Sequence, residues 1–331
     1  MVPFGSIGLS LFGFDLYFAG HEAWVGELRG AGAFMADPGN WRVMVDLTMI
    51  GIFGGFYIVP LYAIIQSRSK PQHRARVIAA NNILNALFMV GSAVLGIGLL
   101  SLGLSIPELF LVMAALNVVV AAYIYAQVPG FLMRFLVWML IAVMYRIHRQ
   151  DMDRIPDQGP VLLVCNHVSY VDALVIAGSC RRPVRFVMDH QIFKTPVLSF
   201  IFRTAGAVPI APRRESPEIY EAAFEKIADY LRRGEVVCLF PEGMLTRDGE
   251  MNQFRPGVER ILSETPVPVV PMSLSGLWGS MFSRIRRGAL GKLPQRFRAN
   301  IRLEVGEAIP AEQATADHLS NVVADLRGES K

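Results

Sequence analysis

The chain has 331 residues, of which 53% are hydrophobic and 18% charged, and its mean hydropathy is +0.38. This is more apolar than an ordinary soluble domain. High apolar content, 29 glycines without a three-residue period and only three cysteines exclude a disordered chain, a collagen-like chain and a disulfide scaffold. Residues 1–130 carry 6 basic and 6 acidic side chains, which leaves 26 and 22 for residues 131–331. The sequence therefore predicts an apolar first part and a second part the size of one globular domain.

Four stretches of the first part approach or exceed the ~20 apolar residues that a membrane-spanning helix needs. They are residues 3–19, 43–66, 77–104 and 109–128. Residues 67–76, between the second and the third, hold four basic residues and no acidic one, which places this loop on the cytoplasmic side. We therefore expect residues 1–130 to form a bundle of four transmembrane helices.

A fifth apolar stretch, residues 131–147, has two interpretations. As a span it would bury Arg134 in the bilayer and place Arg146, His148 and Arg149 on the outer side, against the charge rule. We prefer an amphipathic helix lying in the membrane interface, within a linker at residues 131–155. An ordinary fifth span is the alternative.

The predicted spans contain five polar residues, and the second and third spans are joined by a basic loop. Polar groups within spans either line a transport site or form hydrogen bonds between helices, and both interpretations stay open. The residues are Asp15, Asp46, Asn81, Asn82 and Asn85. The basic loop and the asparagine-containing helix resemble the C-terminal half of a major facilitator transporter. Four or five spans are too few for a complete transporter of about twelve spans.

From about residue 156 to residue 331 the pattern changes to short β-branched runs that alternate with amphipathic stretches. Ser216, Pro217 and Glu218 supply the cap, the first-position proline and the first-turn acid of a helix. This alternation predicts an α/β domain with a mixed sheet flanked by helices. The expected strands are residues 161–165, 184–188, 207–210, 236–240, 267–273 and 300–305.

The first motif that suggests catalysis directly follows an expected buried strand. It reads Asn166-His167-Val-Ser-Tyr-Val-Asp172. A carboxylate about one helical turn after a histidine can fix the imidazole tautomer and leave the other ring nitrogen basic, so the pair would activate a hydroxyl. A helix cap with a satisfied histidine is the alternative. The second motif, Phe240-Pro-Glu242-Gly243, ends another strand, and parallel strand ends share one edge of a sheet. We therefore expect His167, Asp172 and Glu242 to converge.

Three blocks in order, the Asn-His-x4-Asp motif, Phe-Pro-Glu-Gly about 70 residues later and Val-Pro-Val-Val-Pro at residues 267–271, resemble the glycerolipid acyltransferase family over residues 140–310. The resemblance implies that His167 deprotonates an acceptor hydroxyl, oriented by Asp172, and that no serine nucleophile is needed. It also implies that Asn166, Glu242 and Gly243 bind the glycerol acceptor.

Phosphate contacts follow less directly, because two blocks depart from the family pattern. The block Gly206-Ala-Val-Pro-Ile-Ala is followed by a proline where the family has an arginine, so Arg213 or Arg214 would take the phosphate. After Pro-Glu-Gly the first arginine is Arg247, which would be the substrate-binding arginine of that block. The acyl donor implied is a thioester of acyl carrier protein or coenzyme A.

The two parts together resemble bacterial fusions of a lysophospholipid transporter with a lysophospholipid acyltransferase. This implies a protein of the bacterial inner membrane with its catalytic domain on the cytoplasmic side and an incomplete transporter as anchor. The alternatives are a transporter portion with a regulatory or inactive acyltransferase domain, and a hydrolase that uses the same dyad on water.

Other ligands are not indicated. Scattered histidines and unpaired cysteines predict no metal site and no cofactor, and Cys165, Cys180 and Cys238 are expected as reduced thiols. A basic cluster interleaved with apolar residues suits an anionic membrane surface or an acidic carrier protein, and a solvated face is the plain alternative. We do not expect nucleic-acid binding, because no aromatic stacking motif accompanies it. The cluster is Arg284, Arg286, Arg287, Lys292, Arg296 and Arg298.

Overall fold

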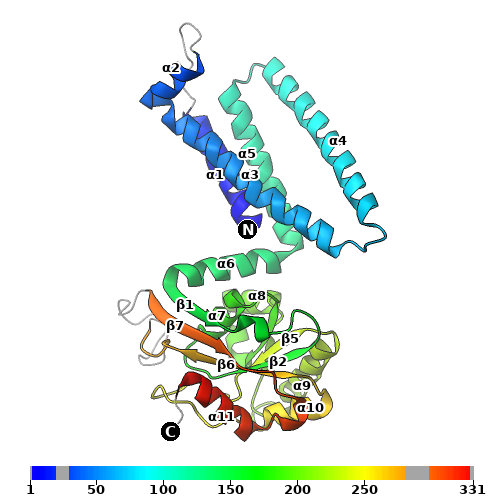
Figure 1. Cartoon of the computed structure of the whole chain (residues 1–331), viewed down its shortest axis with the longest axis vertical. Coiled ribbons are helices and arrows are strands. Elements are labelled where there is room, and N and C mark those ends of the chain that lie inside the picture. The colour runs from blue at the N-terminus through cyan, green and yellow to red at the C-terminus, as the bar shows by residue number, and fades with distance from the viewer. Residues whose placement is uncertain (1, 20–29, 281–297, 329–331) are drawn as a thin grey trace. The chain divides into compact units, whose positions relative to one another are not determined.

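The computed structural model describes residues 2–19, 30–280 and 298–328. Contacts divide the chain into two compact units, Met1–Leu132 and Met133–Lys331 (Figure 1). Arg284, Arg286, Arg287, Lys292 and Arg296 of the expected basic cluster lie outside the described residues. Each unit is described by itself below.

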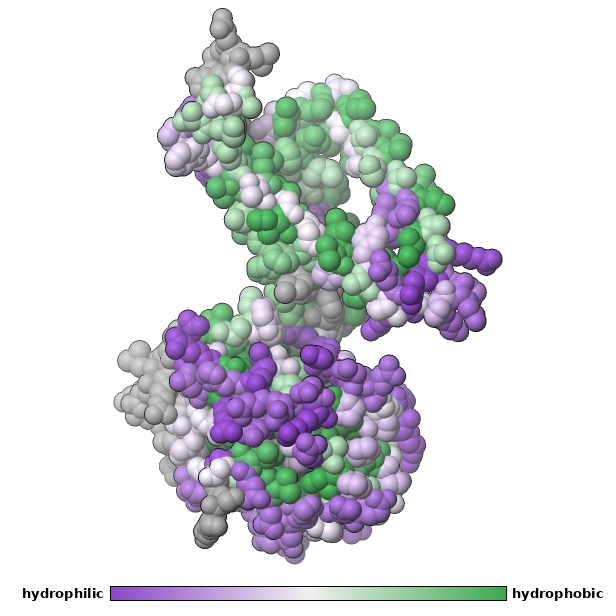
Figure 2. Space-filling model, viewed as in Figure 1, coloured by the Kyte–Doolittle hydropathy of each residue, from purple (hydrophilic) through white to green (hydrophobic). Residues whose placement is uncertain are grey.

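The first unit is helical, and four of its helices are long and apolar enough to cross a membrane. They coincide with the four predicted stretches, which supports membrane association of the chain. Hydrophobic residues cover much of the surface of these helices on the face seen in Figure 2. The helices are α1 (Val2–Ala19), α2 (Ala31–Ala36), α3 (Trp41–Arg68), α4 (Arg74–Ser101) and α5 (Ile106–Gln127), with a 3₁₀ turn η1 (Pro38–Asn40).

Small residues let α1 pack closely on α3 and α5. A Cβ atom at Gly5 would lie 2.6 Å from the backbone nitrogen of Tyr57, and one at Gly13 would lie 3.0 Å from the Cβ of Ala114. Close approach over small residues is the usual way in which helices associate in lipid, where the hydrophobic effect does not drive them together. In α4, by contrast, no residue is buried.

Two of the polar residues in the predicted spans form hydrogen bonds between helices. The guanidinium of Arg42 in α3 donates to both carboxylate oxygens of Asp15 in α1, at 3.1 and 2.5 Å. The amide nitrogen of Asn85 in α4 donates to the hydroxyl of Tyr62 in α3 at 2.7 Å. For these two residues the contacts favour interhelical hydrogen bonding, and a transport role stays a prediction.

The second unit contains a seven-stranded mixed sheet, which confirms the predicted fold class. The strand order is β1-β7-β6-β2-β5-β3-β4, and all neighbouring pairs are parallel except β6 with β7. The strands are β1 (Tyr145–Gln150), β2 (Val161–Cys165), β3 (Val184–Asp189), β4 (Val208–Ile210), β5 (Val236–Leu239), β6 (Val269–Ser275) and β7 (Ala299–Val305). The helices are α6 (Pro129–Met144), α7 (Asp172–Ser179), α8 (Pro196–Thr204), α9 (Pro217–Arg232), α10 (Gly257–Glu264) and α11 (Ala316–Arg327), with 3₁₀ turns η2 (Met152–Arg154), η3 (His190–Lys194) and η4 (Ala311–Gln313).

The sheet has a hydrophobic core on each face, and alternation along the central strands fills both. In β2, Leu163 and Cys165 belong to one core, while Leu162 and Val164 belong to the other. The first core also takes residues of α7, and the second takes residues of α9, α10 and α11 (Figure 1). Because β2 is buried on both faces, it reads in the sequence as an unbroken apolar run.

The structure differs from the sequence prediction at residues 145–150, which form strand β1 within the expected linker. Each residue of β1 pairs with β7, starting with Tyr145 beside Ala299. Only Tyr145 of β1 is buried, since the strand lies at the edge of the sheet, and its basic residues point into solvent. An edge strand with one buried residue gives no apolar run, so the sequence pattern did not reveal it.

Helix α6 packs on the α/β unit. Phe135 and Ile141 are buried, and the absence of a side chain at Gly178 of α7 lets the backbone of Trp138 approach to 3.5 Å from where a Cβ would be. With 16 residues, α6 is about 24 Å long, which is shorter than the ~30 Å core of a bilayer. The helix is therefore short for a fifth span, and its position in the membrane interface stays a prediction.

Candidate active site

The candidate site lies where β2 and β5 end, at the carboxyl edge of the sheet. Asn166 and His167 directly follow β2, and Asp172 is the first residue of α7. Glu242 follows β5, which is the parallel neighbour of β2. Leu163 of β2 is aligned with Cys238 of β5. Parallel neighbours bring their carboxyl ends to the same edge, and this topology places the two sequence motifs side by side.

His167 and Asp172 form a hydrogen-bonded pair. The Nδ1 atom of His167 lies 2.9 Å from the Oδ2 atom of Asp172, which is fully buried. A carboxylate can only accept a hydrogen bond, so the pair holds the imidazole proton on Nδ1 and leaves Nε2 as an acceptor. The same Oδ2 atom also accepts the backbone N–H groups of Val168 at 2.6 Å and Ser169 at 2.9 Å. Three donors thus fix one carboxylate oxygen.

The imidazole ring is held from a second side by Phe240. The two ring centroids lie 4.3 Å apart with planes inclined by 19°, and Phe186 of β3 stacks in turn on Phe240. The side chain of His167 keeps 24% of its surface exposed. The ring is therefore fixed in orientation and still open to a substrate.

Glu242 ties the His167 backbone to the loop that follows β5. Its Oε1 atom accepts the backbone N–H of His167 at 2.6 Å, and its Oε2 atom accepts the backbone and side-chain N–H groups of Asn252 at 2.8 and 2.7 Å. Burial raises the pKa of Glu242, although these hydrogen bonds act in the opposite direction. Both oxygens are occupied within the protein, so Glu242 positions the dyad.

Asn166, like Glu242, uses its polar side-chain atoms for hydrogen bonds within the protein. Its amide nitrogen donates to the carbonyl of Leu274 in β6 at 2.9 Å, and its Oδ1 atom accepts the backbone N–H of Leu274 at 2.8 Å. The side chain is fully buried. Asn166 therefore fastens the end of β2 to β6, and the structure gives it no exposed surface for the substrate contact that the sequence suggested.

Gly243 leaves room for the side chain of Arg255. Its φ is +66°, a left-handed conformation that favours glycine, and a Cβ there would lie 3.0 Å from the guanidinium of Arg255. The backbone N–H of Arg255 donates to the carbonyl of Pro241 at 2.9 Å, which holds this loop beside Glu242. Sequence reasoning named the Phe254-Arg255-Pro256-Gly257 run but gave Arg255 no role. Its basic side chain close behind Phe-Pro-Glu-Gly was the available signal.

The three arginines proposed for phosphate binding occupy different places. Arg247 is exposed and directly follows Thr246, whose backbone N–H donates to the carbonyl of His167 at 3.1 Å. Arg213 and Arg214 follow β4, which lies three strands from β2, or about 14 Å across the sheet. Arg213 is 73% exposed and its Nε atom lies 3.8 Å from Glu221. Arg247 and Arg255 thus belong to the loop whose backbone is bonded to His167 and Pro241, whereas Arg213 and Arg214 lie farther along the same edge.

Two further observations concern Ser169 and the metal-ligating residue types. Ser169, the hydroxyl nearest to His167 in the sequence, is fully buried, so it is not placed as an exposed nucleophile. Within residues 2–19, 30–280 and 298–328, no group of three or more His, Cys, Asp or Glu side chains could hold a metal ion.

The comparisons with known proteins concern the same part of the chain. The Acyltransferase family matches residues 146–275, which include both motifs. The matched residues make up about two fifths of the chain. Over 142 residues the chain is 29% identical to the chloroplastic 1-acyl-sn-glycerol-3-phosphate acyltransferase BAT2 of Brassica napus, covering 42% of this chain and 40% of that one. Over 139 residues it is 30% identical to a probable 1-acyl-sn-glycerol-3-phosphate acyltransferase of Mycoplasma genitalium, covering 40% and 51%.

The chain thus spans between two fifths and half of the length of these curated relatives. Among solved structures, the 1-acyl-sn-glycerophosphate acyltransferase of Thermotoga maritima aligns with a TM-score of 0.45 at 20% identity, over 57% of this chain and 74% of that one. The segment that matches the family model begins in β1 and ends with β6, so it contains the whole carboxyl edge between β2 and β5.

Proposed function

We propose that this chain transfers a fatty acyl group from a thioester of acyl carrier protein or coenzyme A to the free hydroxyl of a lysophospholipid or a 1-acylglycerol-3-phosphate. The observation that carries the proposal is the His167–Asp172 pair, with Nδ1 occupied at 2.9 Å and Nε2 left as an acceptor. The names of the relatives indicate the acceptor class.

In the proposed reaction, Nε2 of His167 takes the proton of the acceptor hydroxyl as its oxygen attacks the thioester carbonyl. The buried carboxylate of Asp172 stabilises the imidazolium that forms. The tetrahedral intermediate collapses, the carbon–sulfur bond breaks, and the departing thiolate takes the proton from His167. One ester forms and one thiol is released, so the step needs no further reactant.

Acceptor binding is assigned to cationic side chains around the dyad. We propose that Arg247 and Arg255 hold the acceptor phosphate, because both lie on the loop fastened to His167 through Thr246 and Glu242. Guanidinium groups match phosphate oxygens in charge and geometry. Arg213 or Arg214 would contact a larger head group farther along the edge, and Gly243 supplies the close approach.

The membrane arrangement is part of the proposal. The basic loop after α3, at residues 67–76, favours a cytoplasmic position for that end of the helix, and the apolar helices suit the inner membrane of a bacterium. The acyltransferase domain would then act on lipids of the cytoplasmic leaflet. The resemblance of residues 1–130 to part of a transporter stays a prediction.

The test uses the full chain in membranes, with labelled acyl-coenzyme A or acyl carrier protein thioester and lysophosphatidate as acceptor. We expect His167→Ala to lower transfer by about 10²–10⁴-fold, the usual contribution of a general base. His318→Ala is the matched control, because His318 is an exposed histidine in α11. Transfer by His167→Ala near the wild-type rate would overturn the proposal.

A further inference from the structure

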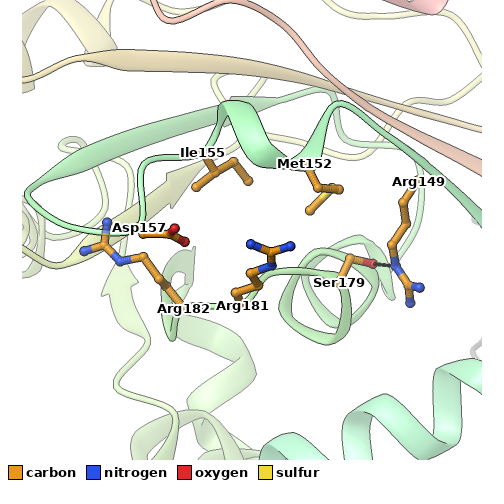
Figure 3. Close-up of a pocket in the computed structure, with 7 residues that line it drawn as sticks. All are labelled: Arg149, Met152, Ile155, Asp157, Ser179, Arg181 and Arg182. Atoms are coloured by element: carbon orange, nitrogen blue, oxygen red, sulfur yellow. Dashed lines mark hydrogen bonds between the residues drawn. The ribbon is translucent and has the colours of Figure 1, made fainter. Parts of the chain in front are cut away.

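A cavity lies at the opposite end of α7 from the dyad. Helix α7 begins at Asp172 and ends at Ser179, so its eight residues separate the two places by about 12 Å. The cavity has a volume of about 200 Å³. It is lined by Arg149, Met152, Ile155, Asp157, Ser179, Arg181 and Arg182 (Figure 3).

Two of its arginines have donors to spare. The guanidinium of Arg181 points into the middle of the cavity toward Met152 and Ile155, and the described part of the chain offers it no hydrogen bond or ion pair (Figure 3). Arg149, which also lines the cavity, uses its Nε atom to donate to the hydroxyl of Ser179 at 3.1 Å, and its two terminal nitrogens lie on the side away from Arg181 (Figure 3). These groups can receive an anion without breaking an existing contact.

Of the other charged groups near the cavity, two arginines are already hydrogen-bonded within the protein and one group is a carboxylate. Arg182 donates to the carbonyls of Pro156, Gly159 and Gly234 at 2.8, 2.8 and 2.6 Å. Arg134 of α6 donates to the carbonyls of Cys180 and Arg181 at 3.3 and 2.9 Å, and so offsets the negative end of the α7 dipole. Asp157 is the one carboxylate in the lining, against the two available guanidinium groups.

The size and walls of the cavity select a small anion. A volume of about 200 Å³ is below the ~300–1,000 Å³ of sites for larger ligands, so a phosphate group fits and a nucleotide does not. Two guanidinium forks suit phosphate oxygens. Met152 and Ile155 offer apolar surface to the carbon atoms attached to such a phosphate.

The neighbouring helix identifies the source of the phosphate. Helix α6 lies along α7, with Trp138 against Gly178 and with Arg134 at the cavity end. Its outer side exposes Leu136, Met139, Leu140 and Val143, each between 39% and 57% exposed. An apolar helix face beside unpaired arginines suits an anionic lipid surface.

We propose that this cavity binds the phosphate of an anionic membrane phospholipid and so holds the acyltransferase domain, with α6, against the lipid surface. The bound lipid is neither donor nor acceptor, because the dyad lies at the other end of α7. This site goes beyond the proposed transfer reaction and does not depend on it.

The test titrates the purified full chain in a neutral detergent with dioctanoylphosphatidylglycerol, with dioctanoylphosphatidylcholine and with inorganic phosphate, measured by calorimetry. The double variant R149A/R181A should bind phosphatidylglycerol about tenfold more weakly or worse, as expected for lost charge-assisted hydrogen bonds. Asp157→Asn should bind it about threefold more tightly, because it removes the carboxylate from the cavity lining. Arg233→Ala, an exposed arginine paired with Asp229, is the matched control and should leave binding unchanged.

Three results would overturn the proposal. An unchanged phosphatidylglycerol affinity in both R149A/R181A and D157N would place the lipid elsewhere on the chain. Phosphatidylcholine could bind as tightly as phosphatidylglycerol, which would remove the role of net charge. Inorganic phosphate could bind as tightly as phosphatidylglycerol, which would make this a site for free phosphate. Because D157N should tighten binding, the proposal stays testable even if the double variant does not fold.

Discussion

The charge of Asp172 can be removed while the geometry of the dyad is kept. In Asp172→Asn, an amide oxygen in the place of Oδ2 still accepts from Nδ1 of His167 and from the backbone N–H groups of Val168 and Ser169. The amide nitrogen then takes the place of Oδ1, which has no hydrogen-bond partner within the described residues. The substitution therefore removes the negative charge and retains the three hydrogen bonds.

The loss falls on the transition state, in which His167 becomes positively charged. A hydrogen bond to a charged group is worth about 1.5–3 kcal/mol, which corresponds to a rate about 10–150-fold lower. The assay compares kcat for acyl transfer to lysophosphatidate by wild type and Asp172→Asn, with thermal unfolding as the check of the fold. Asp172→Ala should in addition destabilise the domain, because it leaves buried backbone N–H groups without an acceptor. A rate for Asp172→Asn within about twofold of wild type would refute the role of a buried counter-charge.

Three further predictions concern the surroundings of the dyad. Glu242→Gln should destabilise the domain by about 1–3 kcal/mol, since one acceptor for the N–H groups of His167 or Asn252 is lost. Burial raises the pKa of Glu242, so the folded state binds the carboxyl proton more tightly than the unfolded state and wild type loses stability as the pH rises above the usual glutamate pKa. The difference in unfolding free energy between wild type and Glu242→Gln should therefore narrow from acidic to neutral pH. A difference that widens in thermal unfolding would contradict the direction of the pKa shift. Gly243→Ala should raise KM for lysophosphatidate by displacing Arg255. Gly257→Ala is the control, because a Cβ at Gly257 meets nothing within 4 Å. Equal KM values for the two variants would count against Arg255 as a phosphate ligand. Burial raises the pKa of Cys180 to about 12 and those of Cys165 and Cys238 well above normal, so a thiol reagent at pH 8 should label these cysteines only after unfolding, and fast labelling of the native chain would contradict their burial.

The sequence predicted the architecture well where a strand or helix is buried on a regular pattern. Strand β2 shows an unbroken apolar run because both of its faces are covered, and α9 shows a capping serine with a proline at its first position. The four apolar helices of the first unit were predicted for a different reason, since each is an apolar stretch long enough to cross a membrane. Burial leaves a periodic trace in the sequence, so these elements could be found without coordinates.

Strand β1 and the engagement of individual side chains could not be found in this way. Strand β1 is held by backbone pairing with β7, about 150 residues away, which leaves no mark on its own composition. Asn166 and Glu242 belong to motifs that suggested substrate contact, whereas the structure shows their polar atoms bound to Leu274, His167 and Asn252. The guanidinium of Arg255 lies beside Gly243, where a Cβ atom would crowd it. Such roles depend on three-dimensional neighbours that the spacing of motifs does not encode.

The central claim, that the dyad activates a lipid hydroxyl, is tested most directly by coupling. The full chain in membranes is given an acyl thioester with and without lysophosphatidate, and the thiol released is compared with the acylated lipid and the free fatty acid formed. The account predicts equal amounts of thiol and acylated lipid when the acceptor is present, and almost no thiol release without it. Thiol release at the same rate in the absence of acceptor, with free fatty acid as the product, would contradict the account and indicate a hydrolase.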